Sequence, residues 1–105
     1  DKIVKNIKKE VTIEYIQEIV SEYFQLSLEE LQSKTRKRHV VQARQLAMFF
    51  AKKYTKLSLA SIGKLIGKRD HATVLHACKT VDNLNETDKQ FRKFFADLTT
   101  KINNR

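Results

Sequence analysis

The chain has 105 residues, of which 41% are hydrophobic, and it carries a formal net charge of +9. This is the size of one ordinary domain with a single modest core. No apolar run approaches the ~18 residues that span a bilayer, no secretory leader opens the chain, and the single cysteine excludes an intramolecular disulfide and a cysteine-based zinc site. We therefore expect a cytoplasmic protein, and the missing initiator Met suggests a fragment.

The positive charge is concentrated in the middle of the chain. Residues 34–79 hold twelve Lys or Arg and one acidic residue, a net charge of +11, whereas the two flanks together sum to −2. A basic block between flanks of little net charge is typical of a surface that binds a polyanion.

Two helices are predicted in the first third of the chain. Apolar residues recur at helical spacing between Ile13 and Tyr23, and the opposite face carries three glutamates, so we expect this helix to avoid DNA. Ser27 and Glu30 have the spacing of a capping box, which predicts a short second helix. Residues 33–39 are predicted to form a loop.

A long central helix, about residues 40–54, is predicted from its apolar stripe. Its first turns are expected to present Gln42, Arg44 and Gln45 outward. Near the other end of the chain, Thr87 and Gln90 repeat the capping-box spacing and predict a last helix whose phenylalanines face the core.

Between these segments, two helices flank a turn marked by a glycine. Ser58 can cap the first helix, and Gly67 can adopt the left-handed geometry that ends it. Asp70 can cap the second helix by accepting hydrogen bonds from its free backbone N–H groups. Helices near residues 58–66 and 70–85 would form a helix-turn-helix.

These elements predict an all-α fold with about six helices in one domain. No strand-like alternation is sustained, no internal repeat occurs, and no proline interrupts a predicted helix.

The second helix of this pair has a polar leading end. Val74 and Cys78 recur at helical spacing and must face the core. The residues left near the exposed leading end are His71, Ala72, Thr73 and His76. Small or hydrogen-bonding side chains of this kind suit base edges in the major groove of DNA.

The run GKRDHATVLHA, which begins at Gly67, resembles the signature helix-turn-helix of the bacterial chromosomal replication initiator family, DnaA, usually close to GGRDHTTVLHA. The segments SKTR at 33–36 and ARQLAM at 43–48 extend the resemblance over roughly residues 11–103. The resemblance implies binding of duplex DNA at origin boxes of the TTATCCACA type, without enzymatic activity in this chain.

The resemblance also implies a longer protein. Residues 1–26 would be a connector helix from an ATP-binding module that precedes Asp1, and residues 27–105 would be the helix-turn-helix domain. No cofactor is expected in this chain, because it lacks a G-x-x-x-x-G-K-[ST] phosphate loop. The expected partners are origin DNA, other initiator modules and protomers, with acidic phospholipid as a further candidate, and the expected location is the nucleoid.

Site residues follow residue by residue from the same resemblance. The predicted base contacts, one in the minor groove and the others in the major groove, are Arg36, Leu59, Ala60, Asp70, His71, Ala72 and Thr73. Further residues of the same surface are predicted to contact the DNA backbone. They are Lys34, Arg38, Arg44, Gln45, Lys52, Lys68, Arg69, His76 and Lys79.

Four positions depart from the family pattern, among them Thr80, which replaces the basic residue that is usual there. Ala72 stands where threonine is usual and Ala60 where proline is usual, which would shift or loosen the box preference. Lys68 replaces the second glycine of the usual pair, and we expect an ordinary negative φ there.

Several alternatives stay open at this level. Asp70 can act as a helix cap, as a base contact, or as both, and the basic loop can be simply solvated. A metal pair of His71 and His76 is not expected, because a spacing of five points them apart on a helix. Two other functions compete: a dimeric helix-turn-helix transcription regulator, and a basic module that binds anionic membrane surfaces.

Overall fold

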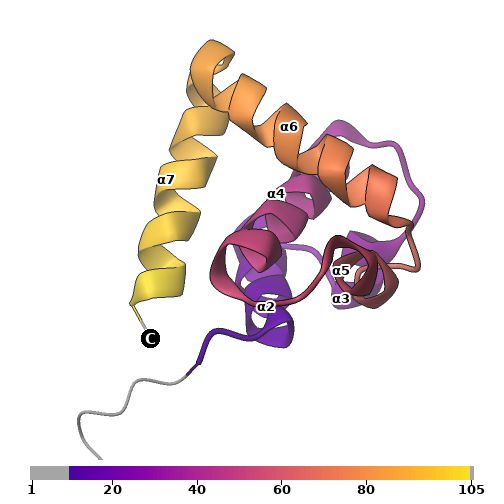
Figure 1. Cartoon of the computed structure of the whole chain (residues 1–105). Coiled ribbons are helices and arrows are strands. Elements are labelled where there is room, and N and C mark those ends of the chain that lie inside the picture. Colours follow the sequence, from indigo (N-terminus) through magenta and orange to yellow (C-terminus); the bar gives the residue numbers. More distant parts are fainter. Residues whose placement is uncertain (1–9, 105) are drawn as a thin grey trace, which may run out of the picture.

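The computed structural model describes residues 10–104 and contains six helices and no strand within them (Figure 1). The helices are α2 (Ile13–Phe24), α3 (Leu28–Gln32), α4 (Arg38–Tyr54), α5 (Leu59–Leu65), α6 (His71–Thr87) and α7 (Lys89–Asn103). The predicted all-α fold is thus confirmed. The first nine residues of the predicted connector lie outside the described residues, and α2 begins directly after its N-cap, Thr12. None of the helices between residues 10 and 104 is long and apolar enough to cross a membrane.

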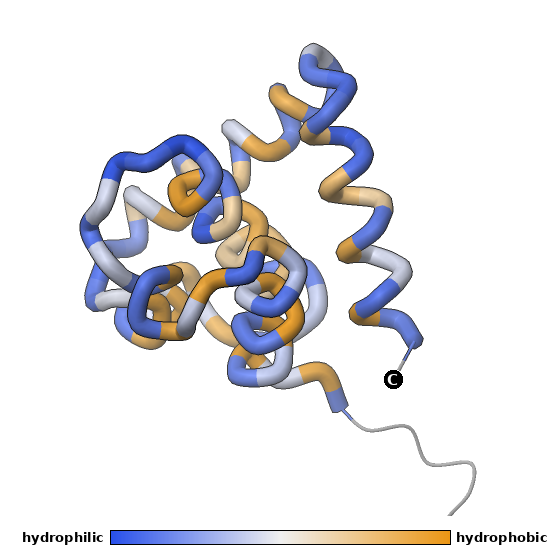
Figure 2. Tube along the Cα trace, turned by 180° about the vertical axis from the view of Figure 1, so that it is seen from behind, coloured by the Kyte–Doolittle hydropathy of each residue, from blue (hydrophilic) through white to orange (hydrophobic). Residues whose placement is uncertain are grey.

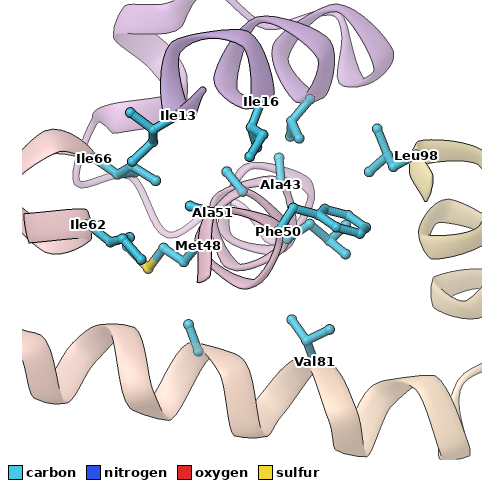
Figure 3. Packing of buried hydrophobic residues seen from close by; sticks show 14 of the residues in the cluster. Ile13, Ile16, Ala43, Met48, Phe50, Ala51, Ile62, Ile66, Val81 and Leu98 are labelled. Atoms are coloured by element: carbon cyan, nitrogen blue, oxygen red, sulfur yellow. The ribbon is translucent and has the colours of Figure 1, made fainter. Parts of the chain in front are cut away.

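Helix α4 is the centre of the core. Figure 3 views it end-on, with α2 above it, α6 below it and α7 to one side. Ala43, Phe50 and Ala51 of α4 are completely buried, as are Ile16 of α2 and Val81 of α6. Because small residues alternate with large ones on α4, neighbouring helices approach it closely from several directions.

Aromatic rings join α7 to this core. The ring centroids of Phe95 and Phe50 lie 5.1 Å apart, and Phe49 lies 5.3 Å from Phe95. Tyr23 of α2 donates a hydrogen bond of 2.6 Å to the carboxylate of Asp97, and burial together with this carboxylate raises the pKa of Tyr23 to about 12. The predicted role of the phenylalanines as core residues is confirmed.

The capping predictions succeed at α3 and fail at α7. Ser27 and Glu30 form the full capping box, with reciprocal hydrogen bonds of 3.0 and 2.9 Å. The predicted box at Thr87 is wrong, because Thr87 is the last residue of α6 and its hydroxyl donates to the carbonyl of Asn83. Asp88 caps α7 instead by accepting from the backbone N–H of Phe91 at 3.1 Å.

The predicted loop is shorter than expected, because α4 begins at Arg38 rather than at Val40. Its N-cap, Lys37, makes no side-chain capping bond, so no capping residue marks the start of this helix in the sequence. The backbone N–H of Lys37 is held instead by the Thr35 hydroxyl at 3.3 Å. Figure 2 shows the stretch between α3 and α4 as a continuous hydrophilic loop, which we call the basic loop, residues 33–37.

Candidate nucleic-acid interface

The turn between α5 and α6 is built from two consecutive residues with positive φ. Gly67 has φ +80° and Lys68 has φ +58°. The expected negative φ at Lys68 is therefore wrong. The turn then closes with a hydrogen bond of 2.7 Å from the backbone N–H of Arg69 to the carbonyl of Gly63. The left-handed geometry costs a lysine roughly 1–2 kcal/mol, which the tertiary contacts of the turn must offset.

The first turn of α6 is exposed and ordered by its cap. The Asp70 carboxylate accepts from the backbone N–H and the hydroxyl of Thr73, both at 2.9 Å, which confirms the predicted cap. These hydrogen bonds from Thr73 lower the pKa of Asp70. His71, Ala72 and Thr73 are all exposed beside it. Four predicted base contacts, residues 70–73, thus lie together at the positive end of the helix dipole. We call them the polar tip of α6.

The cap predicts a pH-dependent loss of stability in Asp70→Ala. The folded pKa of Asp70 lies below the ordinary value of 3.8, so its carboxylate stabilises the folded state above that value. This contribution is lost as the pH falls through the folded pKa. We expect the variant to melt several degrees lower at neutral pH and the difference to shrink below pH 3.8.

Thermal melts followed by circular dichroism across this pH range measure the effect. Asp82→Ala, at an exposed position in the middle of the same helix, is the matched control. A melting difference for Asp70→Ala that stayed constant at acidic pH would contradict the role assigned to the carboxylate.

The basic loop is fixed at both of its ends to the segments that flank α6. At its start, the Ser33 carbonyl accepts a hydrogen bond of 2.7 Å from Arg69, which precedes α6. Just after its end, the guanidinium of Arg38 lies 3.6 Å from the carboxylate of Asp88, which follows α6. Because five residues of extended chain reach at most about 17 Å, the basic loop lies beside part of α6, which is about 25 Å long at 1.5 Å per residue.

Three cations of the basic loop face solvent along this path. Lys34, Arg36 and Lys37 are exposed. Exposed cations beside the polar tip of α6 can meet the phosphates that flank a groove, or enter a narrow minor groove.

Arg44 is not presented outward as expected. It is only 8% exposed, and its Nε and Nη2 donate to the carbonyls of Leu31 and Thr35 at 3.0 and 3.4 Å. Burial lowers the pKa of Arg44, and the positive charge of Arg69 lowers it further. The guanidinium therefore joins α3 to the middle of the basic loop through the carbonyls of Leu31 and Thr35.

Arg69 is also turned toward the protein. Its Nη1 and Nη2 groups donate to carbonyls of its own turn and of the segment that follows α3. Burial lowers the pKa of this guanidinium as well. These hydrogen bonds hold the Nη1 and Nη2 groups against the backbone of the protein.

The remaining predicted contacts lie on three helices. His76 and Lys79 of α6 and Lys52 of α4 are exposed, and Lys52 lies close enough to Cys78 to lower the pKa of its thiol. Desolvation is the larger effect on this thiol and raises its pKa overall, as for a half-buried cysteine. Gln45 is half-buried.

On α5 the two predicted apolar contacts differ in accessibility. Ala60 is exposed, whereas Leu59 is half-buried and packs against the core cluster. Only part of Leu59 is therefore accessible to a ligand.

Sequence reasoning missed the role of Gly63. A β-carbon there would collide with the Arg69 carbonyl oxygen and lie 2.9 Å from the Arg69 carbonyl carbon. The sequence did hold a signal for it, because the chain has only two glycines, one in this turn and the other four residues before it. The absence of a side chain at Gly63 lets the turn lie directly against α5.

Comparison with known proteins identifies this arrangement. Residues 13–81 match the family model described as the bacterial DnaA protein helix-turn-helix. The chain belongs to this family. The match covers α2 to α6 up to Val81, and therefore both the basic loop and the helix-turn-helix.

Three proteins named chromosomal replication initiator protein DnaA are similar over most of the chain. One from Flavobacterium psychrophilum is 74% identical over 97% of this chain and 21% of its own length. One from Bacteroides thetaiotaomicron is 53% identical over 86% of this chain and 19% of its own length. One from Lachnoclostridium phytofermentans is 44% identical over 98% of this chain and 23% of its own length. The chain thus spans about a fifth of the length of these DnaA relatives.

The part of DnaA that this chain matches is the DNA-binding helix-turn-helix domain, which is not catalytic. Between residues 10 and 104, no group of three or more His, Cys, Asp or Glu side chains is placed to hold a metal ion.

Proposed function

We propose that this domain binds short duplex sequences of the TTATCCACA type at a replication origin and anchors a DnaA-type initiator there. The observation that carries the proposal is the polar tip of α6, residues 70–73, exposed beside a basic loop that is fixed to the same helix-turn-helix. In this arrangement α6 enters the major groove, and Arg36 reaches the adjacent minor groove. Phosphate contacts from the surrounding cations set the register.

A full-length initiator of the DnaA type would supply further activities. An ATP-binding module preceding residue 1, other protomers on the same origin and a location at the nucleoid are all parts of this proposal. The coverage of the relatives supports a longer protein, whereas the ATP-binding module, the protomers and the nucleoid are what the resemblance to the DnaA family implies.

Selection of bound duplexes from a random pool tests the proposed specificity. We expect enrichment of boxes similar to TTATCCACA, with relaxed preference at the base pair that Ala72 meets, because alanine offers a methyl group and no hydroxyl. A pool that stays random after several rounds, although protein is bound, would contradict sequence-specific recognition.

Lys52→Ala separates phosphate binding from base recognition. Lys52 is exposed in the last turn of α4 and lies near Cys78 of α6 rather than among residues 70–73. Removing one phosphate contact should weaken binding to matched and scrambled duplexes alike, by a few-fold, and should reduce the slope of log K against log salt by about 1. A loss confined to the matched duplex would show that Lys52 takes part in base recognition.

Acidic phospholipid is the second proposed partner, because the basic loop could also meet anionic headgroups. The face of α2 that carries Glu14, Glu18 and Glu22 is exposed and would be repelled by such a surface. Flotation with vesicles containing phosphatidylglycerol, without DNA, tests this partner. Co-flotation at physiological salt would support it, and a domain left at the bottom of the gradient would exclude it.

A further inference from the structure

The side chain of Arg69 ties two parts of the chain together. Within its own turn, Nη1 donates to the carbonyls of Ile66 and Gly67 at 3.0 and 3.3 Å. Across the fold, Nη1 donates to the Gln32 carbonyl at 3.1 Å and Nη2 to the Ser33 carbonyl at 2.7 Å. One guanidinium therefore joins the turn before α6 to the start of the basic loop.

The surrounding backbone leaves room for this guanidinium. A β-carbon at Gly67 would collide with Nη1 of Arg69 and lie 2.6 Å from the Gln32 carbonyl oxygen. At Gly63, a β-carbon would collide with the backbone of Arg69 itself. Both glycines of the chain are thus placed where a side chain would displace Arg69.

Gln32, whose backbone carbonyl accepts a hydrogen bond from Arg69, is also held by hydrogen bonds from its own side chain. Its Nε2 donates to Oε1 of Gln17 on α2 at 2.7 Å and to the carbonyl of Leu65 at 3.3 Å. The attachment point of the basic loop is therefore held from α2, from α5 and from the turn.

Only a guanidinium fits this set of acceptors. Arg69 donates to four carbonyl oxygens that lie in different directions, and neither of the two ion pairs found within residues 10–104 involves it. The planar fork of arginine presents five N–H donors, whereas the ammonium of lysine is a compact point charge. A lysine at position 69 would keep the positive charge. It could not donate hydrogen bonds to the turn and to the start of the basic loop at the same time.

We propose that Arg69 is a positioning residue for base recognition rather than a phosphate ligand. It fixes the loop that carries Arg36 relative to the polar tip that carries His71. Arg36 can then contact the minor groove while His71 contacts the major groove of the same DNA site. The inference rests on the proposed function, because it concerns the two elements that would contact DNA.

Arg69→Lys tests the proposal on a TTATCCACA duplex and a scrambled duplex, with binding measured at several salt concentrations. Since the charge is kept, we expect an unchanged salt slope and unchanged affinity for the scrambled duplex. Affinity for the matched duplex should fall roughly tenfold, because contacts in the two grooves no longer form together. If Arg69→Lys distinguished the matched from the scrambled duplex as well as the wild type does, the proposal would be overturned.

Lys68→Gln is the matched control from the same turn. Lys68 is exposed, and removal of its charge should weaken both duplexes equally and reduce the salt slope by about 1. If Arg69→Gln reproduced only this pattern, with discrimination kept, Arg69 would be a phosphate ligand and the proposal would be wrong.

Trypsin digestion without DNA tests the same link independently of the proposed function. Arg69→Lys should be cleaved faster than the wild type after Lys34, Arg36 and Lys37, whereas Lys68→Gln should be cleaved there at the wild-type rate. Equal rates in all three proteins would overturn the proposal. A wild-type domain that failed to discriminate between duplexes would instead overturn the proposed function, and the digestion would still decide whether Arg69 holds the loop.

A measurement on the wild-type domain avoids any folding defect of the variants. In ¹⁵N-arginine spectra, the Nη protons of Arg69 should be protected from exchange before and after addition of the matched duplex. Protection that appears only with DNA would identify a phosphate ligand and contradict the positioning role.

Discussion

Gly63→Ala is expected to lower the free energy of unfolding by about 3 kcal/mol, the upper range for overpacking a tight site. In an ordinary helix the same change stabilises by roughly 0.5–1 kcal/mol, because alanine has less backbone entropy to lose. The sign is reversed here because the new β-carbon would collide with the Arg69 carbonyl, which is backbone and cannot rotate away. Relief requires moving the turn away from α5.

Denaturant unfolding of the variant and the wild type measures this difference. Lys64→Ala, an exposed change in the same helix, is the control and should stay within about 0.5 kcal/mol of the wild type. A Gly63→Ala domain as stable as the wild type would mean that the turn does not pack against α5 as described.

Arg36→Ala and His71→Ala should each reduce discrimination between matched and scrambled duplexes by about 10- to 100-fold, since one good base contact contributes roughly 1–3 kcal/mol. Arg36 is exposed in the basic loop and His71 is exposed in the first turn of α6, so neither change should disturb the core. Competition binding measures the ratio of the two affinities. Lys52→Ala supplies the contrast, because its effect should be equal on both duplexes.

The two variants also differ in where discrimination is lost. The arginine variant should become tolerant of changes at the base pairs of the minor-groove contact, and the histidine variant at those of the major-groove contact. Equal losses on specific and scrambled DNA for Arg36→Ala, His71→Ala and Lys52→Ala would remove the basis for the assigned base contacts.

The helices could largely be predicted from the sequence, because their determinants are local. Apolar spacing located α2, α4 and α7, and capping residues located the starts of α3 and α6. The predicted cap at Thr87 failed because α6 continues through this residue and Asp88, next in the chain, offers a better acceptor. The start of α4 could not be located because its N-cap, Lys37, makes no side-chain capping bond.

The exposed residues of the candidate site could be predicted from the sequence. The buried residues that hold them in place could not. Residues 70–73 and the exposed cations of the basic loop lie at accessible surface positions, as expected for contacts with a ligand. Arg44 and Arg69 look like further cations in a basic sequence, yet each donates to carbonyls of residues distant along the chain, Leu31 for Arg44 and Ser33 for Arg69. The positive φ of Lys68 likewise depends on tertiary contacts of the turn.

We expect this domain to recognise a specific duplex sequence through α6 and the basic loop. Fluorescence anisotropy with a TTATCCACA duplex and a scrambled duplex, across a salt series, tests it most directly. Binding to the matched duplex should be tighter, and the difference between the two duplexes should persist at higher salt, because base contacts do not depend on released counterions. Two superimposed curves that weaken together with salt would contradict it and leave only a non-specific basic domain.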